Sequence, residues 1–396
     1  MSLLLVGSAA APAHAEPVPG KQWHLGAMKA EQMWQTSKGK GLTVAVIDTG
    51  VDPESPGLEG RVLDGKDFAP SSRAGDEHTD YDGHGTAMAG LIAGSGEYGG
   101  GNGAFGLAPG ADILPVRMPD TKDVSPFEVP TYFSKGIRYA ADSGARIINV
   151  SMGGGMDSAE LTKAVEYALY KGALVLAGTG NDAEKKQGVA YPAATPGVVG
   201  VAAVGKNLRR ASWSQRGPQV DIAAPGDEIH ALCRNGKGTC EGHGTSDATA
   251  LASASAALIW SKHPDWTNNQ VLRVMLNTIG GPTDGAKRND SIGYGIVRPR
   301  VALEKPGDPG PADEYPLPDL KKPSPPAPSS PEAETPDDRR TPAAAPAAAE
   351  DGGGGTNTTT WIVTGVGAAA LIGGAAAAMA VRRRRSVAHA HVTGRP

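Results

Sequence analysis

The chain has 396 residues, enough for one large α/β domain with appendages or for two ordinary domains. Its 55 glycines and 32 prolines are unusually many, and because the prolines cluster late, a folded part and a tail of different composition are read separately. The formal net charge of -4 and the absence of a basic stripe before the tail argue against nucleic acid as a partner and favour a globular enzyme or binding module.

Residues 1–15 resemble a secretory signal peptide. Leu3–Val6 is a short apolar run, and Ala13–Ala15 has the A-x-A pattern of a cleavage site. The basic residues that normally precede the apolar core are missing, so either the true start lies upstream or the signal is truncated. The alternative is a frayed, alanine-rich N-terminus. We expect the mature chain to be exported.

Residues 16–304 read as one α/β domain, with a mostly parallel sheet covered by helices on both faces. The reason is that short apolar, β-branched runs alternate with amphipathic stretches. Buried strands are predicted over residues 42–47, 146–150, 174–177 and 198–204.

Two further helices are predicted from capping patterns. Asp157 stands three residues before Glu160, and Thr267 stands three residues before Gln270, each ahead of apolar residues at helical spacing.

The cysteines, Cys233 and Cys240, lie close together in a glycine-rich stretch. In an exported protein they can pair and close a small loop, whereas two thiols without C-x-x-C spacing make a metal site improbable. The alternative is two unrelated free thiols.

The tail consists of three segments that differ in composition. Residues 305–360 are rich in proline and poor in large apolar residues, which predicts an extended linker. Residues 361–381 carry no charge and are long enough for one transmembrane helix, and four arginines open the basic segment 382–396. The positive-inside rule then places the C-terminus in the cytoplasm and the folded domain outside the cell membrane.

Three motifs carry candidate catalytic groups. Asp48 ends the first predicted strand in IDTGVD, at the edge where open α/β sheets collect functional groups. His84 lies between glycines in DGHGT, and Ser246 opens an alanine-rich helix in GTSDATA, where the helix dipole favours the negative charge of acyl transfer. Taken singly, the three could be a turn residue, a loop histidine and an N-cap.

Two competing interpretations involve the same motifs. Carboxylates and imidazoles crowd near His84 and could form a metal site, although a solvated acidic loop explains them; they are Asp76, Glu77, His78, Asp80, Asp82 and His84. His243 is an alternative base, but it lies only three residues before Ser246 on a turn. We therefore expect no metal and no cofactor.

Together, the motifs in the order Asp, His, Ser resemble the subtilisin-like (subtilase) family of serine proteases, as do NVSMGG at 149–154 and GTGN at 178–181. The resemblance implies that Ser246 is the nucleophile, His84 the general base and Asp48 the group that orients the imidazole. It also implies that Asn181 donates its amide to the oxyanion.

The same resemblance implies a substrate-binding edge. Ser151, Gly153 and Gly154 match the family's strand that pairs with substrate backbone, and the small Gly178 suggests an open pocket floor.

Two residues depart from the family's pattern. Asp247 follows the serine where an apolar residue is usual, and Ala250 stands where a proline is usual. A carboxylate at Asp247 opposes the developing oxyanion if it points inward. The layout of signal, protease domain, proline-rich linker, single span and basic tail resembles the mycosins, proteases attached to type VII secretion systems. The sequence thus predicts a membrane-anchored endopeptidase with protein or peptide substrates and a link to that machinery. The alternative is a weakly active or inactive subtilase-fold scaffold that braces a secretion complex.

Overall fold

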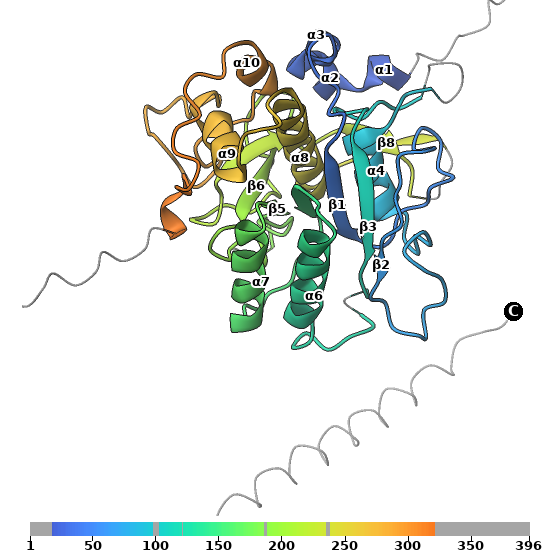
Figure 1. Cartoon of the computed structure of the whole chain (residues 1–396). Coiled ribbons are helices and arrows are strands. Elements are labelled where there is room, and N and C mark those ends of the chain that lie inside the picture. The colour runs from blue at the N-terminus through green and yellow to red at the C-terminus, as the bar shows by residue number, and fades with distance from the viewer. Residues whose placement is uncertain (1–17, 98–102, 121, 186–187, 235–237, 321–396) are drawn as a thin grey trace, which may run out of the picture. The chain divides into compact units, whose positions relative to one another are not determined.

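The computed structural model describes residues 18–320 apart from 98–102, 121, 186–187 and 235–237 (Figure 1). Short helices α1 (Val18–Lys21), α2 (Trp23–Met28) and α3 (Ala30–Trp34) open this part of the chain. A parallel sheet with helices on both faces follows (Figure 1). The α/β fold predicted from the sequence is therefore confirmed.

Seven strands make up the sheet within the described residues, in the order β2-β3-β1-β4-β5-β6-β7, and neighbouring strands run parallel. Their bounds are β1 Thr43–Asp48, β2 Lys66–Asp67, β3 Asp112–Arg117, β4 Ile147–Val150, β5 Leu174–Gly178, β6 Val199–Val204 and β7 Ile222–Pro225. An antiparallel hairpin of β8 (Ile229–Leu232) and β9 (Thr239–Gly242) stands beside it.

Two apolar cores lie on opposite faces of the sheet. Along β1, Val44 and Val46 face one core, and Ala45 and Ile47 face the other, as expected for a strand buried on both sides. The first core is covered by helices α4 (His84–Ala93), α8 (Thr245–Lys262), α9 (Asn268–Asn277) and α10 (Pro299–Glu304). The second is covered by α6 (Val129–Asp142) and α7 (Ala159–Tyr170).

The four predicted strands are present within a residue of the expected bounds, whereas β3 was not foreseen. Its apolar run contains Pro115, which normally argues against an inner strand. Asp112 and Met118 donate their N–H groups toward β1, while Ile113 donates to Arg61 on the other side. Pro115, two residues after Ile113, therefore turns its missing N–H away from β1 and leaves the β1 ladder intact.

Of the two predicted helix caps, the cap of α9 is at the predicted residue, and the cap of α7 is one residue later than predicted. Thr267 and Gln270 form the reciprocal capping box that opens α9. Helix α7 is capped by Ser158, whose hydroxyl accepts from the Leu161 N–H, and not by Asp157. The Asp157 carboxylate instead accepts the N–H of Ser158, the residue next to it.

Residues 305–320, predicted as the start of the linker, pack on the folded body. The Arg273 guanidinium donates to the backbone carbonyls of Pro309, Pro311 and Glu314. Leu317 is fully buried, and the Asp319 carboxylate accepts the N–H of Gly197. The folded body thus extends past the predicted boundary at 304/305. Backbone carbonyls bonded to one arginine hold this proline-rich segment, which has few apolar side chains of its own.

The remaining predicted segments lie outside the described residues. These are the signal peptide at 1–15, the rest of the linker, the apolar run 361–381 and the basic tail. Among the described residues, the structure has no helix long and apolar enough to cross a membrane.

The N-terminal segment is held to the β8–β9 side of the body through side chains. Gln22 exchanges hydrogen bonds with the backbone of Phe105, and the Trp23 indole donates to the carbonyls of Asp227 and Glu228. The next residue, His24, is fully buried, and neither ring nitrogen finds a hydrogen-bond partner among the described residues.

This burial predicts a pH-dependent stability. Burial, with a smaller contribution from His230, lowers the pKa of His24 to about 3. Unfolding exposes an imidazole that takes up a proton below its ordinary pKa, so the folded state loses stability as the pH falls below that value. Between about pH 7.5 and about pH 5, His24 is expected to remove about 2 kcal/mol of stability.

Thermal or denaturant unfolding of His24→Leu measures this effect. The variant should lose less stability than the wild type between the two pH values. Equal slopes in the wild type and His24→Leu would contradict the assignment.

Candidate active site

The site lies at the carboxyl edge of the sheet, where parallel strands deliver their ends to one place. Asp48 is the last residue of β1, Ser151 directly follows β4, and Gly178 is the last residue of β5. Two helices begin at this edge: α4 with His84 as its first residue, and α8 with Ser246 as its second. The sequence motifs are thus brought together by topology, although they are far apart along the chain.

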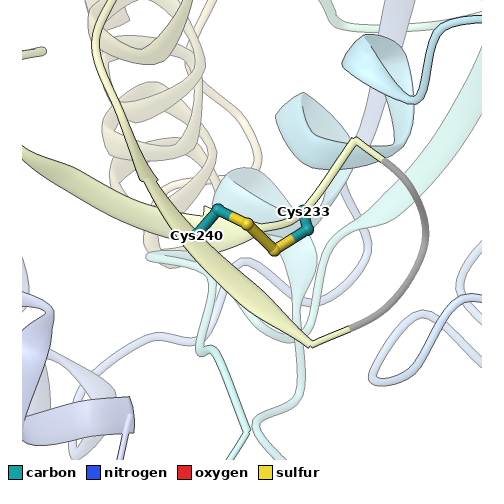
Figure 2. The surroundings of a disulfide bond; sticks show 2 residues. All are labelled: Cys233 and Cys240. Carbon is teal, nitrogen blue, oxygen red and sulfur yellow. A yellow bond between two sulfur atoms is a disulfide. The ribbon is translucent and has the colours of Figure 1, made fainter.

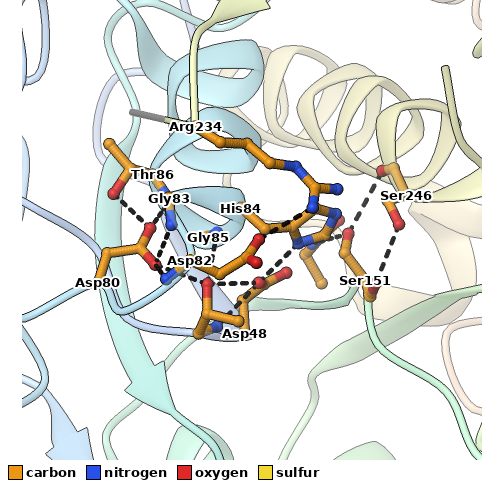
Figure 3. A network of polar contacts seen from close by, with 12 residues as sticks. Asp48, Asp80, Asp82, Gly83, His84, Gly85, Thr86, Ser151, Arg234 and Ser246 are labelled. Carbon is orange, nitrogen blue, oxygen red and sulfur yellow. Dashed lines mark hydrogen bonds and ion pairs between the residues drawn. The ribbon is translucent and has the colours of Figure 1, made fainter. Parts of the chain in front are cut away.

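Asp48 and His84 form a hydrogen-bonded pair (Figure 3). The His84 Nδ1–H donates to Asp48 Oδ1 at 2.7 Å, and the Asp48 side chain is fully buried. The same carboxylate oxygen accepts the N–H of Thr49 at 2.8 Å. Burial alone would lower the pKa of His84, but the adjacent Asp48 charge and its hydrogen bond outweigh this and raise it. With Nδ1 bonded to Asp48, Nε2 is the ring nitrogen left for proton transfer.

A turn before α4 fixes the position of His84. Its centre is Asp80, whose carboxylate accepts from the Thr49 hydroxyl, the Gly83 N–H and both the N–H and hydroxyl of Thr86 (Figure 3). Gly83 has a left-handed backbone with φ of 81°, and a Cβ there would collide with the Arg234 carbonyl. These contacts hold the residues on either side of His84.

The acidic residues considered for a metal site serve other contacts. Asp76 caps its own turn through the Thr79 hydroxyl and the His78 N–H, and Asp82 pairs with Arg234 at 2.9 Å. His78 Nε2 lies 3.1 Å from the Leu63 carbonyl.

Ser246 lies beside the strand end of β4. Its hydroxyl donates to the backbone carbonyl of Ser151 at 3.0 Å, and the Ser151 hydroxyl donates to the Ser246 carbonyl at 3.3 Å (Figure 3). His84 and Ser246 line one cavity.

A buried polar chain, which the sequence did not reveal, fixes α8 against β4. The Ser253 hydroxyl donates to Asn149 Oδ1 at 3.0 Å, and Asn149 Nδ2 donates to Ser151 Oγ at 2.9 Å. Both Asn149 and Ser253 are fully buried. Since a buried polar group without a partner is strongly unfavourable, this chain specifies the position of the helix that carries Ser246.

Asn181 is oriented by Thr245, the residue before the serine. Asn181 Oδ1 accepts the N–H and the hydroxyl of Thr245, both at 2.9 Å. Because a backbone N–H can only donate, the oxygen of the amide is fixed on this side. The two N–H groups of Nδ2 then face the other way, and Asn181 lines the cavity that contains His84 and Ser246.

Two cavities meet at Ser246 and Asn181. The one on the His84 side has a volume of about 460 Å³ and is lined by Asp247 and the β8–β9 hairpin. The other, of about 790 Å³, is lined by the predicted substrate-binding residues Ser151, Gly153, Gly154 and Gly178.

Within this second group, Gly154 differs from expectation. Its N–H and carbonyl are both hydrogen-bonded to the backbone of Tyr191, at 2.9 and 2.8 Å. Its backbone is therefore already paired, and the exposed Gly153 beside it is the better placed of the two to meet a substrate strand.

A disulfide joins Cys233 to Cys240 across the end of the β8–β9 hairpin (Figure 2). Both cysteines line the cavity on the His84 side. The predicted pairing thus also tethers one wall of the site.

Comparison with known proteins defines the class to which this fold and site belong. The subtilase family model matches residues 39–295, about two thirds of the chain, so the chain belongs to the subtilase family. It is 36% identical over 235 residues to subtilisin E from Bacillus subtilis, which is 59% of each chain. The chain thus spans about three fifths of the length of that relative.

Within the family, the chain is similar to mycosins. It matches the MycP3 protease from the type VII (ESX-3) secretion system with a TM-score of 0.63 and 31% identity, over 75% of this chain and 90% of that one. It matches MycP1 from Mycobacterium smegmatis with a TM-score of 0.64 and 26% identity, over 73% and 86%. The predicted resemblances to the subtilase family and, within it, to the mycosins are confirmed.

Proposed function

We propose that the protein is a serine endopeptidase with Ser246 as nucleophile, His84 as general base and acid, and Asp48 as the orienting carboxylate. The observation that carries the proposal is the 2.7 Å hydrogen bond from His84 to the buried Asp48, because His84 lines the same cavity as Ser246. Membership of the subtilase family supports the same assignment.

The reaction follows from this geometry. As His84 Nε2 takes the hydroxyl proton, Ser246 Oγ attacks the scissile carbonyl, and Asp48 stabilises the imidazolium. The oxyanion receives the Nδ2–H of Asn181 at the N-terminal end of α8, where the helix dipole also favours negative charge. His84 then gives the proton to the leaving amine, and water hydrolyses the acyl-enzyme by the same steps in reverse.

Substrate backbone lies along the edge formed by Ser151 and Gly153. A carbonyl acceptor is present there, since Ser151 O already accepts the Ser246 hydroxyl and is released when that hydroxyl turns to His84. An extended peptide added to this edge is held by main-chain hydrogen bonds, which suits substrates of varied sequence.

A direct test uses the purified full-length protein and a mixed peptide library. New termini inside the peptides, identified by mass spectrometry and lost after treatment with a sulfonyl fluoride, are the expected result. Products trimmed only from peptide ends, or products insensitive to the inhibitor, would contradict a serine endopeptidase.

We also propose that the protease acts on the outer face of the cell membrane in association with type VII secretion. The apolar run 361–381 followed by arginines supports the anchor and its orientation. Similarity to proteases from type VII secretion systems supports the association.

This topology predicts the outcome of limited proteolysis on intact protoplasts. Added protease should cut within the proline-rich segment after Leu320 and release the folded domain, while a tag placed after Pro396 stays protected. Digestion of the tag with survival of the folded domain would show the opposite orientation.

A further inference from the structure

The unusual residue beside the nucleophile, Asp247, is a buried carboxylate in the wall of the site. It is the third residue of α8, only 7% exposed, and it lines the cavity on the His84 side. None of the ion pairs formed among the described residues includes it. Within the part of the chain that the structure describes, the cavity therefore contains a buried acidic group without a lysine or arginine ion-pair partner.

Such a group is unfavourable unless something stabilises its charge. Burial raises the pKa of Asp247 to about 6, although His84 opposes the shift, so the carboxylate is ionised at neutral pH. The positive end of α8 contributes to this, because Asp247 lies in the first turn. A small apolar side chain would fill the same space without the free-energy cost of burying a charge. What the carboxylate contributes to the cavity is therefore its negative charge, and not better packing.

The chemistry of acyl transfer defines which part of the substrate enters this cavity. His84 must hand its proton to the departing amine, so the peptide segment after the scissile bond lies on the His84 side of Ser246. The segment before the bond lies in the opposite cavity, along Ser151 and Gly153. Asp247 therefore faces the first residue of the leaving segment.

The other charged groups around this cavity leave it acidic. Arg234, on the hairpin, is paired with Asp82 at 2.9 Å and is largely exposed. Glu241, also on the hairpin, is exposed at the rim, where its carboxylate lies 3.7 Å from His230 Nδ1. The exposed His243 contacts the Trp213 ring. Two carboxylates, Asp247 in the wall and Glu241 at the rim, thus remain to attract a cation.

We propose that this cavity selects substrates with lysine or arginine directly after the scissile bond, and that Asp247 binds the cationic side chain. The inference rests on the endopeptidase function proposed above. It also gives Asp247 a role during the reaction, since a bound cation neutralises the carboxylate that would otherwise oppose the oxyanion.

The test compares two internally quenched peptides that are identical except for the residue after the scissile bond, lysine in one and uncharged norleucine in the other. For the wild type, kcat/KM for the lysine peptide should exceed that for the norleucine peptide by about tenfold or more, as expected for a hydrogen-bonded buried charge. In Asp247→Asn the ratio should fall to about one. The control Glu160→Gln, at an exposed carboxylate on α7 that lines neither cavity, should keep the wild-type preference.

Because both peptides meet the same enzyme preparation, the ratio does not depend on how much of a variant folds. A wild-type pH series adds a second measurement that needs no variant: the preference should decline as the pH falls through about 6, where Asp247 becomes protonated. His84, Arg234 and His243 are the charged or titratable neighbours of Asp247. Protonation of His84 as the pH falls disfavours the cation in the same direction, whereas the charge of Arg234 does not change over this range.

The outcomes separate the two proposals. Cleavage of both peptides by the wild type with equal efficiency, or a preference for norleucine, would overturn the assignment of Asp247 and leave the endopeptidase function standing. A preference for lysine that Asp247→Asn retains would overturn it as well. Failure of the folded wild type to cleave any peptide would overturn the endopeptidase function, and this inference with it.

Discussion

Replacing Ser246 by alanine is expected to abolish peptide hydrolysis, with a loss in kcat on the order of 10⁶-fold. The change removes the attacking oxygen and one hydrogen bond, the 3.0 Å contact with the Ser151 carbonyl. The fold should survive, because the rest of α8 is held by the buried chain from Ser253 to Asn149. Steady-state hydrolysis of a cleaved peptide, with circular dichroism to verify folding, measures both effects.

A matched control on the same helix is Ser255→Ala. The Ser255 hydroxyl donates to the Leu251 carbonyl within α8 and does not line either cavity described at the site. This variant should retain activity close to that of the wild type. If Ser246→Ala kept its activity after purification free of contaminating proteases, the assigned mechanism would be wrong.

Replacing Asp48 by asparagine should lower kcat by about 10⁴-fold while the protein stays folded. The amide is nearly the same size, but its N–H2 group can favour the imidazole tautomer with the proton on Nε2, which cannot accept the serine proton. The charge of Asp48 also raises the pKa of His84, so the variant should titrate lower. In the wild type, activity requires a neutral imidazole and should increase as the pH rises through a pKa above the ordinary histidine value.

Double variants test whether the three residues act as one unit. His84→Ala should reduce kcat nearly as much as Ser246→Ala, and combining the two should add little. Losses that multiply in the double variant would show that the residues contribute independently, contrary to a shared proton transfer.

Much of the fold followed from local sequence patterns, because strands buried on both faces are continuously apolar. The strand ending at Asp48 and the capping box of α9 are examples. Strand β3 was not predicted because it contains Pro115. A proline is tolerated there because its missing N–H would face away from β1, and this direction depends on tertiary pairing. The packing of residues 305–320 was not predicted because the residue that anchors them, Arg273, lies on a helix elsewhere in the chain.

For the site, the motifs identified the candidate catalytic side chains but not the residues that position those side chains. Asp80 lies in an acidic segment that the sequence predicts to be a solvated loop. In the structure its carboxylate accepts the hydrogen bonds that organise the turn before His84. Asn149 belongs to a recognised motif, but its bond to Ser253 joins residues 104 positions apart. Only the folded chain shows such partners, as it also shows that Gly154 is already paired with Tyr191.

The central claim, that Ser246 is a nucleophile activated by His84, is tested most directly by covalent labelling with a fluorophosphonate probe. The full-length protein should be modified once, and peptide mass spectrometry should locate the adduct on Ser246. Labelling should disappear in Ser246→Ala and become much slower in His84→Ala. A folded wild-type protein that is not labelled, or a Ser246→Ala variant labelled as fast as the wild type, would contradict the account.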